Sequence, residues 1–189
     1  MRGQAHTLEG VAAALIVVVA VAFTLQATAV TPLTASTASQ HIETQHEQAA
    51  AGLLETASAD GSLSATLRHW NATRAGFWNA SRQGYYVGST PNTTFGDALE
   101  ATFGERSVAY NLNAYYVDGD GDRRLRRIVY NGQPSSDAVA ATRLVTLYDD
   151  QPVTGTDGGP TLENASYFGP DDPGPAYGVV EVEVVVWRM

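Results

Sequence analysis

The sequence contains no cysteine and no lysine, and only 16% of its residues are charged. Without cysteine the chain can form no disulfide, no thiolate nucleophile and no sulfur-ligated metal centre. All 11 basic residues are arginine, and 20 acidic residues outnumber them to give a formal charge of -9. This balance disfavours nucleic-acid binding, which needs a basic surface. It indicates adaptation to high salt, where a carboxylate-rich surface stays hydrated.

The common catalytic motifs are also absent. The chain has no H-E-x-x-H, G-x-S-x-G, G-x-G-x-x-G or P-loop sequence. His41 and His46 are five positions apart, which is about 140° around a helix, so they do not present one metal site. A length of 189 residues allows one modest domain plus an appendage. We expect no enzyme activity and no cofactor, apart from the calcium ion considered below.

The most apolar part of the chain lies near its N-terminus. Residues 10–23 read GVAAALIVVVAVAF, and the stretch continues less strictly to Val30. A helix of about 21 residues is roughly 30 Å long, which matches the hydrocarbon core of a bilayer. The pattern therefore predicts a transmembrane helix over residues 10–30. The alternative is a cleaved secretory signal with a cleavage site at residues 27–29, but Glu9 lies directly against the apolar run.

The distribution of arginine and of glycosylation sequons predicts an orientation. No basic residue occurs between Arg2 and Arg68, so the positive-inside rule places the N-terminus in the cytoplasm. We therefore expect a single-pass protein of the cell membrane, with membrane lipid as a partner and an extracellular C-terminal domain. Four N-x-S/T sequons follow the apolar stretch and predict a glycoprotein, with acceptors at Asn71, Asn79, Asn92 and Asn164.

The first residues, MRGQAHTLEG, resemble the precursors of archaeal type IV pilin-like and pseudopilin-like single-span membrane proteins, including those of haloarchaea. Such proteins carry a basic residue and a glycine at the processing site, an early glutamate, and a hydrophobic helix that packs in the filament core. Arg2-Gly3 matches the first feature and Glu9 the second. Cleavage after Gly3 makes Glu9 the sixth mature residue, whereas cleavage after Gln4 puts it in the usual fifth place. The resemblance covers about the first 55 residues.

This resemblance implies partners and roles for particular residues. The leader would be a class III signal peptide, cut by a prepilin peptidase at Gly3 or Gln4. Like or related pilin-like subunits would be the assembly partners, and Glu9 would act in assembly. A carboxylate at the edge of an apolar region needs a cation or a helix N-terminus as partner. In a filament the freed amino group of a neighbouring subunit could supply that cation, whereas in a lone anchor Glu9 would rest among lipid headgroups.

The remaining pattern predicts an α+β fold in four segments. A short leader covers residues 1–9, the transmembrane helix 10–30, a helical stalk 31–59, and a small β-rich exterior head 60–189. Thr31-Pro32 predicts a kink, because proline removes a backbone donor and clashes with the preceding turn. The stalk carries a mostly apolar stripe at helical spacing, formed by Ile42, Ala49, Ala50, Leu53, Leu54 and Ala57.

Within the head, two short helices and an antiparallel sheet are expected. The helices cover residues 63–70 and 95–103, the second capped by Thr94, and residues 71–92 between them read as a loop. Strands are predicted at 107–117, 125–131 and 177–188, where β-prone or alternating residues recur. Residues 138–148 fit either a helix or a strand, and we favour a strand for their second half.

One acidic loop is a candidate metal site. Asp118, Asp120 and Asp122 alternate with glycines, as in the first half of a calcium-binding EF-hand loop. The match then ends, because Arg123 stands where that loop has glycine and Val129 where it has glutamate. The alternative is a solvated hairpin tip whose acids face nearby arginines, namely Arg123, Arg124, Arg126 and Arg127.

Two functions are compatible with these patterns. The first is a structural subunit of, or an accessory to, a type IV pilus-like cell-surface assembly, anchored by the N-terminal hydrophobic helix. The alternative is a membrane-tethered exterior binding module that does not polymerise and holds a ligand or cation through aromatic or Asp-rich loops. Five aromatic residues near the first sequons could stack on sugars or on a surface ligand, although we favour packing in the core of the head. They are Trp70, Phe77, Trp78, Tyr85 and Tyr86.

Overall fold

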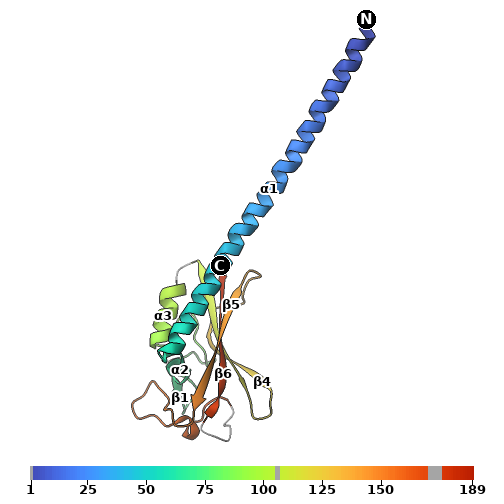
Figure 1. Ribbon diagram of the computed structural model, residues 1–189. Coiled ribbons are helices and arrows are strands. Elements are labelled where there is room, and N and C mark those ends of the chain that lie inside the picture. The colour runs from blue at the N-terminus through green and yellow to red at the C-terminus, as the bar shows by residue number, and fades with distance from the viewer. Residues whose placement is uncertain (1, 105–106, 170–175) are drawn as a thin grey trace. The chain divides into compact units, whose positions relative to one another are not determined.

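The computed structural model describes the backbone of residues 2–104, 107–169 and 176–189, and the side chains of residues 9–24, 40–104, 107–169 and 176–189. The chain divides into two compact units, Met1–Ile42 and Glu43–Met189. A helix, α1 (Arg2–Ala59), accounts for the described part of the first unit and for the start of the second (Figure 1). The second unit adds short helices and antiparallel sheets.

The prediction of a transmembrane helix over residues 10–30 is wrong. Among the residues that the structure describes, no helix combines the length and the apolar character needed to cross a membrane. The strictly apolar run ends at Phe23, which gives about 21 Å of helix against a hydrocarbon core about 30 Å thick. Extending it to Val30 meant counting Thr24, Gln26 and Thr28 as part of the span. The predicted membrane anchor and single-pass localisation, with a cytoplasmic N-terminus and an extracellular domain, are wrong for the same reason.

The sequence also predicted a kink between two helical segments at Thr31-Pro32, but α1 is a single helical element across these residues. A proline removes one backbone hydrogen bond without necessarily ending the helix. Their side chains lie outside the described part of the chain. Further along α1, the predicted apolar stripe is confirmed, because Ala50, Leu54 and Ala57 are buried.

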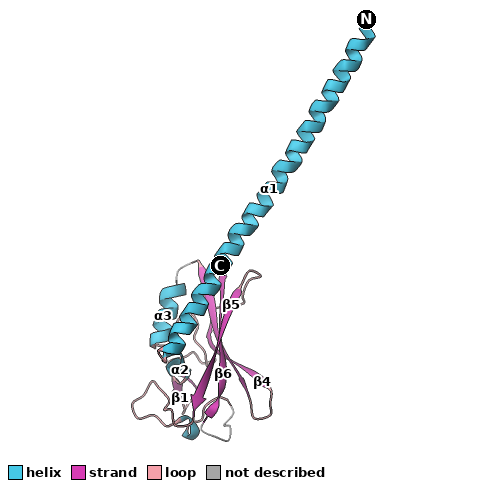
Figure 2. Cartoon of the chain, viewed as in Figure 1, coloured by secondary structure: helices cyan, strands magenta, loops and turns pink. Residues whose placement is uncertain are grey.

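A four-stranded antiparallel sheet forms the centre of the second unit. Its strand order is β4-β3-β6-β5, so the C-terminal strand lies between two strands that precede it in the chain (Figure 2). The strands are β3 (Val108–Val117), β4 (Arg123–Tyr130), β5 (Val139–Tyr148) and β6 (Ala176–Arg188). The predicted strands at 107–117, 125–131 and 177–188 are confirmed, and the ambiguous residues 138–148 form a strand throughout most of their length.

The two faces of the sheet follow from the alternation of residue types along β6. Its even-numbered valines, from Val180 to Val186, are buried, and the intervening Glu181 and Glu183 point to the other face. Glu183 accepts hydrogen bonds from Asn113 Nδ2 at 2.9 Å and from the Tyr115 hydroxyl at 3.1 Å. The valine face carries the core, whereas the opposite face is mixed, with Glu181 and Glu183 beside exposed apolar side chains such as Leu144 and Val179.

Helices cover the valine face. The end of α1, α2 (Ser62–Leu67) and α3 (Thr94–Phe103) lie along it in Figure 1, and their buried residues form one hydrophobic cluster with the sheet. The N-cap of α3 is Thr93, whose hydroxyl accepts from Gly96 N at 3.1 Å, so the predicted cap was one residue late. A β-carbon on Gly96 would lie 1.9 Å from the Pro91 carbonyl oxygen, which explains the glycine at this position.

Two strands of two residues each occupy the segment predicted as a loop. They are β1 (Trp70–Asn71) and β2 (Gly76–Phe77), and they pair antiparallel. Strands this short have too few residues to show an alternating pattern. A non-local contact follows, because Tyr86 forms a parallel bridge with Val129 of β4. That bridge holds the segment after β2 against the sheet.

Candidate functional site

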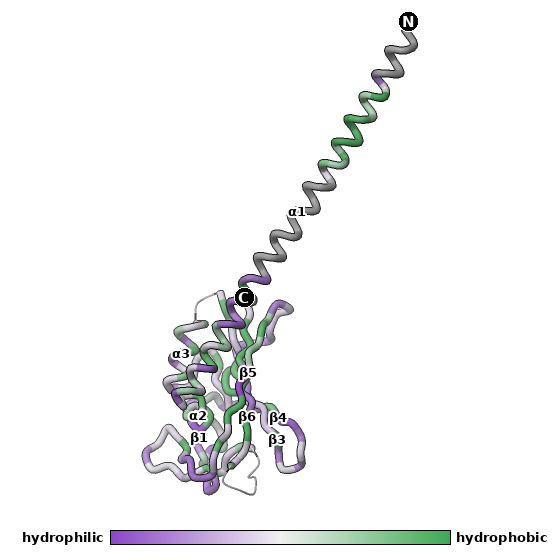
Figure 3. Tube along the Cα trace, viewed as in Figure 1, coloured by the Kyte–Doolittle hydropathy of each residue, from purple (hydrophilic) through white to green (hydrophobic). Residues whose placement is uncertain are grey.

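The first candidate site is the apolar segment, residues 10–23 of α1. Every side chain of residues 9–24 is exposed, so no face of this helix is covered by the described part of the chain. The segment is the continuous hydrophobic stretch near the N-terminus in Figure 3. Its larger side chains are between 52% and 72% exposed, and they are Val11, Leu15, Ile16, Val17, Val18, Val19, Val21 and Phe23.

Polar residues bound this segment at both ends. Glu9 precedes it, and Thr24 follows it, with a hydroxyl that donates to the carbonyls of Ala20 at 3.0 Å and Val21 at 2.8 Å. The Thr24 hydroxyl is thereby satisfied within the helix. The predicted processing residues Gly3 and Gln4 lie outside the residues whose side chains are described. Processing at these residues, and an assembly role for Glu9, stay predictions.

A helix that is apolar on all sides is stable when other apolar surfaces enclose it. Burying a large aliphatic or aromatic side chain contributes about 1.5–3 kcal/mol. Eight such side chains are exposed along the apolar segment. Covering them with other apolar surfaces would therefore contribute a large favourable free energy. The side chains of this segment can contact other apolar surfaces but offer no polar or titratable group.

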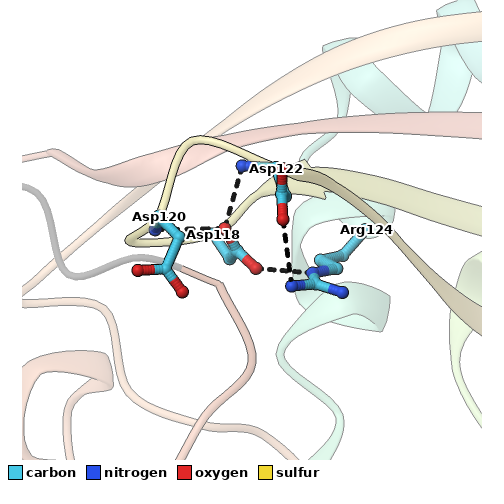
Figure 4. A network of polar contacts seen from close by, with 4 residues as sticks. All are labelled: Asp118, Asp120, Asp122 and Arg124. Atoms are coloured by element: carbon cyan, nitrogen blue, oxygen red, sulfur yellow. Dashed lines mark hydrogen bonds and ion pairs between the residues drawn. The ribbon is translucent and has the colours of Figure 1, made fainter.

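The acidic loop is the second candidate, and the carboxylates of Asp118 and Asp122 contact the Arg124 guanidinium of β4 (Figure 4). Asp118 Oδ1 accepts from the backbone N–H groups of Asp120 at 3.1 Å and Asp122 at 2.9 Å. Asp118 Oδ2 pairs with Arg124 Nε, and Asp122 Oδ2 lies 3.3 Å from Arg124 Nη2. The hydrogen bond from Arg124 is the main cause that lowers the pKa of Asp118.

This arrangement matches a hairpin tip neutralised by arginine. No group of three His, Asp or Glu side chains suited to a metal lies within the described residues, and calcium binding by Asp118, Asp120 and Asp122 stays a prediction. Only part of the expected charge pairing is present in this loop, because Arg123 pairs with Glu181 at 3.0 Å instead. Arg126 and Arg127 contact aromatic rings, those of Trp70 and Tyr130.

The four sequon asparagines differ in accessibility. Asn71 is buried, and its Oδ1 accepts from the backbone N–H groups of Thr73 at 3.0 Å and Arg74 at 3.1 Å. Asn79, Asn92 and Asn164 are exposed. A glycosyl donor can therefore reach the last three side chains in the folded chain, whereas the Asn71 amide is engaged in its own turn.

Of the five aromatic residues near these sequons, three belong to the core. Trp70, Phe77 and Tyr86 are buried. Trp70 and Phe77 meet edge to face with ring centroids 5.2 Å apart, and Trp70 Nε1 donates to the Ser166 carbonyl at 2.7 Å. Core packing, one of the two predicted roles, is confirmed for these three, while Trp78 and Tyr85 are half-buried.

A pocket of about 610 Å³ is the third candidate. Residues 71–84 form most of its lining, and Arg126 of β4 completes it. Arg74 and Arg82 also line it, so three arginines line one cavity in a chain of net charge -9. No acidic residue is among the lining residues.

Comparison with known proteins places the chain in a family without an assigned activity. A profile described as a family of unknown function (DUF7288) matches residues 2–186. The chain belongs to this family. No curated protein and no solved structure matches it. The DUF7288 match extends over both the apolar segment and the arginine-lined pocket.

Sequence reasoning missed the pocket of this DUF7288 chain, although one signal points to it. Residues 61–96 contain three arginines and no acidic residue, in a chain where acidic residues are nearly twice as frequent as basic ones. The sequence near Arg126 does not indicate that this residue lines the pocket, because its position there depends on the bridge between Tyr86 and β4.

Proposed function

We propose that this chain is a structural subunit of a type IV pilus-like assembly, held together by the apolar segments of several copies. The observation that carries the proposal is the continuous exposure of residues 10–23 on every side of α1. A single partner would cover one face of this helix, whereas a bundle of like helices covers all of them. The occupant we infer is therefore α1 of other copies of the same or a related chain.

Two further observations support this proposal. The N-terminal sequence carries the basic-glycine pair and the early glutamate of type IV pilin-like proteins, whose hydrophobic helices pack together in the filament. The length of the apolar run, about 21 Å of helix, is that of a helix buried in a protein core. The second unit has a core of its own, so the exposed apolar side chains of residues 10–23 are available for association.

The experiment measures assembly of the purified full chain by sedimentation velocity and electron microscopy, at high salt and without detergent. We expect the wild-type chain to sediment as assemblies with a regular repeat. The variant Ile16→Asp places a charge where the side chain is 70% exposed and would be enclosed in the assembly. Burying an unpaired carboxylate costs several kcal/mol, so this variant should sediment as a small species.

Leu144→Asp is the matched control, because Leu144 is an apolar side chain of β5 with 65% exposure outside the apolar segment. It should assemble like the wild type. A wild-type chain that remains monomeric at every concentration tested, or an Ile16→Asp chain that assembles normally, would refute the proposal. The mass of the mature N-terminus from the native source tests processing separately, with cleavage expected after Gly3 or Gln4.

A further inference from the structure

We propose that the arginine-lined pocket binds a sugar acid, a small organic molecule that combines a carboxylate with several hydroxyl groups. Its volume of about 610 Å³ lies in the range typical of small-molecule sites. The lining offers two kinds of group, guanidinium groups for an anion and neutral amides and hydroxyls for hydroxyl groups. This inference concerns the second unit and does not depend on the proposed assembly.

The charge of the pocket is the first argument. Arg74 and Arg82 are exposed, and neither guanidinium forms an ion pair within the described part of the chain. Other arginines of the second unit do, such as Arg143 with Glu55. Because acidic residues are absent from the whole of residues 61–96, the positive charge of this pocket is not offset by neighbours in sequence. A carboxylate is the natural partner of such groups, since it can accept two parallel hydrogen bonds from one guanidinium.

Arg126 provides a fixed cation at this pocket. Its Nη2 donates to the Ala75 carbonyl at 2.9 Å, and its Cζ lies 4.8 Å from the centre of the Trp70 ring. A β-carbon on Gly84 would approach Nη2 to 3.5 Å, so the loop fits closely against the guanidinium. The Nε atom is buried and forms no hydrogen bond to the described residues. Burial lowers the pKa of Arg126, and a bound anion would offset that cost.

The neutral lining argues for hydroxyl groups on the ligand. Asn79 and Gln83 are lining residues whose amide side chains both donate and accept hydrogen bonds, and the Ser81 hydroxyl, which donates to the Tyr85 carbonyl at 2.6 Å, can still accept one. An inorganic anion such as sulfate would use the arginines and leave these groups to solvent. A sugar acid has hydroxyl groups next to its carboxylate and can use both sets together.

The backbone of the lining is also unusual. Ala75 and Asn79 adopt positive φ angles of 48° and 57°. Asparagine tolerates this region, whereas for Ala75 it costs about 1–2 kcal/mol. Both residues line the pocket. Strained backbone of this kind concentrates at ligand sites, where the surrounding structure holds it in place. The bridge from Tyr86 to β4, with Tyr86 N donating to the Ile128 carbonyl at 2.8 Å, supplies such a restraint.

The experiment titrates the full-length chain with glucuronate, glucose and sulfate, using isothermal calorimetry at the lowest salt concentration at which circular dichroism shows the fold intact. We expect glucuronate to bind at least tenfold more tightly than either glucose or sulfate. Raising the salt concentration should weaken binding, because the attraction is partly ionic. Equal binding of sulfate and glucuronate would overturn the sugar assignment, and the absence of glucuronate binding would overturn the site.

Variants locate the site without disturbing the core. Arg74→Gln and Arg82→Gln change exposed side chains, and each should weaken glucuronate binding about tenfold. Arg127→Gln is the matched control, an exposed arginine of β4 that does not line the pocket, and it should bind like the wild type. Equal weakening by Arg127→Gln would show that the net charge of the chain, and not this pocket, controls binding. Failure here leaves the assembly test on Ile16→Asp unaffected.

Discussion

Replacing Leu54 by alanine tests whether the end of α1 is a structural part of the second unit. Leu54 is 1% exposed and belongs to the same buried cluster as Phe95 of α3 and Val182 of β6. Its side chain therefore links the helix to the sheet. We expect Leu54→Ala to destabilise the whole second unit, and not only the last turn of α1.

The magnitude follows from the burial of the side chain. Truncating a fully buried leucine to alanine costs about 2–5 kcal/mol, because the cavity left behind is only partly filled. Helix propensity does not add to this loss, since alanine is the stronger helix former. For a domain of this size each kcal/mol shifts Tm by about 2–4 °C. Leu54→Ala should lower Tm by roughly 4 to 20 °C.

Guanidinium chloride unfolding of the full chain measures this change, with the fluorescence of the buried Trp70 as the signal and one protein concentration for all variants. Leu144→Ala is the matched control, since it makes the same substitution at a side chain that is 65% exposed. Its effect should stay within about 0.5 kcal/mol. Equal free energies of unfolding for the two variants would refute the packing of α1 into this core.

Three further predictions concern the second unit. Gly155→Ala should destabilise more than Gly158→Ala when Tm is compared, because a β-carbon at Gly155 would lie 2.4 Å from the Trp78 ring while one at Gly158 meets nothing within 4 Å, although φ is positive at both. Burial raises the pKa of Tyr86 to about 12, so the folded state keeps a proton that the unfolded state loses near pH 10. The free energy of unfolding should fall between pH 10 and 12, and Tyr86→Phe should make that fall smaller without abolishing it, because burial also raises the pKa of Tyr110 and of Tyr167. Peptide mass mapping of the native protein should find glycan on Asn79 and none on Asn71, whose amide is buried and hydrogen-bonded; a fully modified Asn71 would show that glycan is added before the chain folds.

The strands could be predicted from the sequence because their patterns are local. β6 alternates valine with glutamate, so period-two reasoning finds both its extent and its buried face. The apolar stripe at the end of α1 is equally local, and Leu54 was found in the same way. The strand order was out of reach, because placing β6 between β3 and β5 depends on pairings between residues 28 to 80 positions apart in the chain.

The error at the N-terminus has a different cause. A helix of fourteen apolar residues and one of about twenty differ only in a few polar side chains at one end, here Thr24, Gln26 and Thr28. Counting these three residues as part of the apolar run lengthened it to that of a transmembrane helix, whereas fourteen residues is a length typical of a helix buried in a protein core. The apolar character itself was identified correctly. Because residues 10–23 are exposed in the described part of the chain, their burial against other apolar surfaces would be strongly favourable.

Only part of the arginine-lined pocket could be predicted from the composition of the sequence, because one of its arginines is brought there by the fold. The acid-free run of residues 61–96 could have marked Arg74 and Arg82 as unusual, since in this chain a stretch of that length would ordinarily contain three or four acidic residues. Arg126 lies among four arginines beside an aspartate-rich loop, so the sequence favours pairing with those aspartates. The bridge between Tyr86 and Val129 brings this part of β4 to the 71–84 segment instead. Arg126 therefore contacts the Ala75 carbonyl and the Trp70 ring in place of a carboxylate, and its positive charge has no ion-pair partner within the described residues.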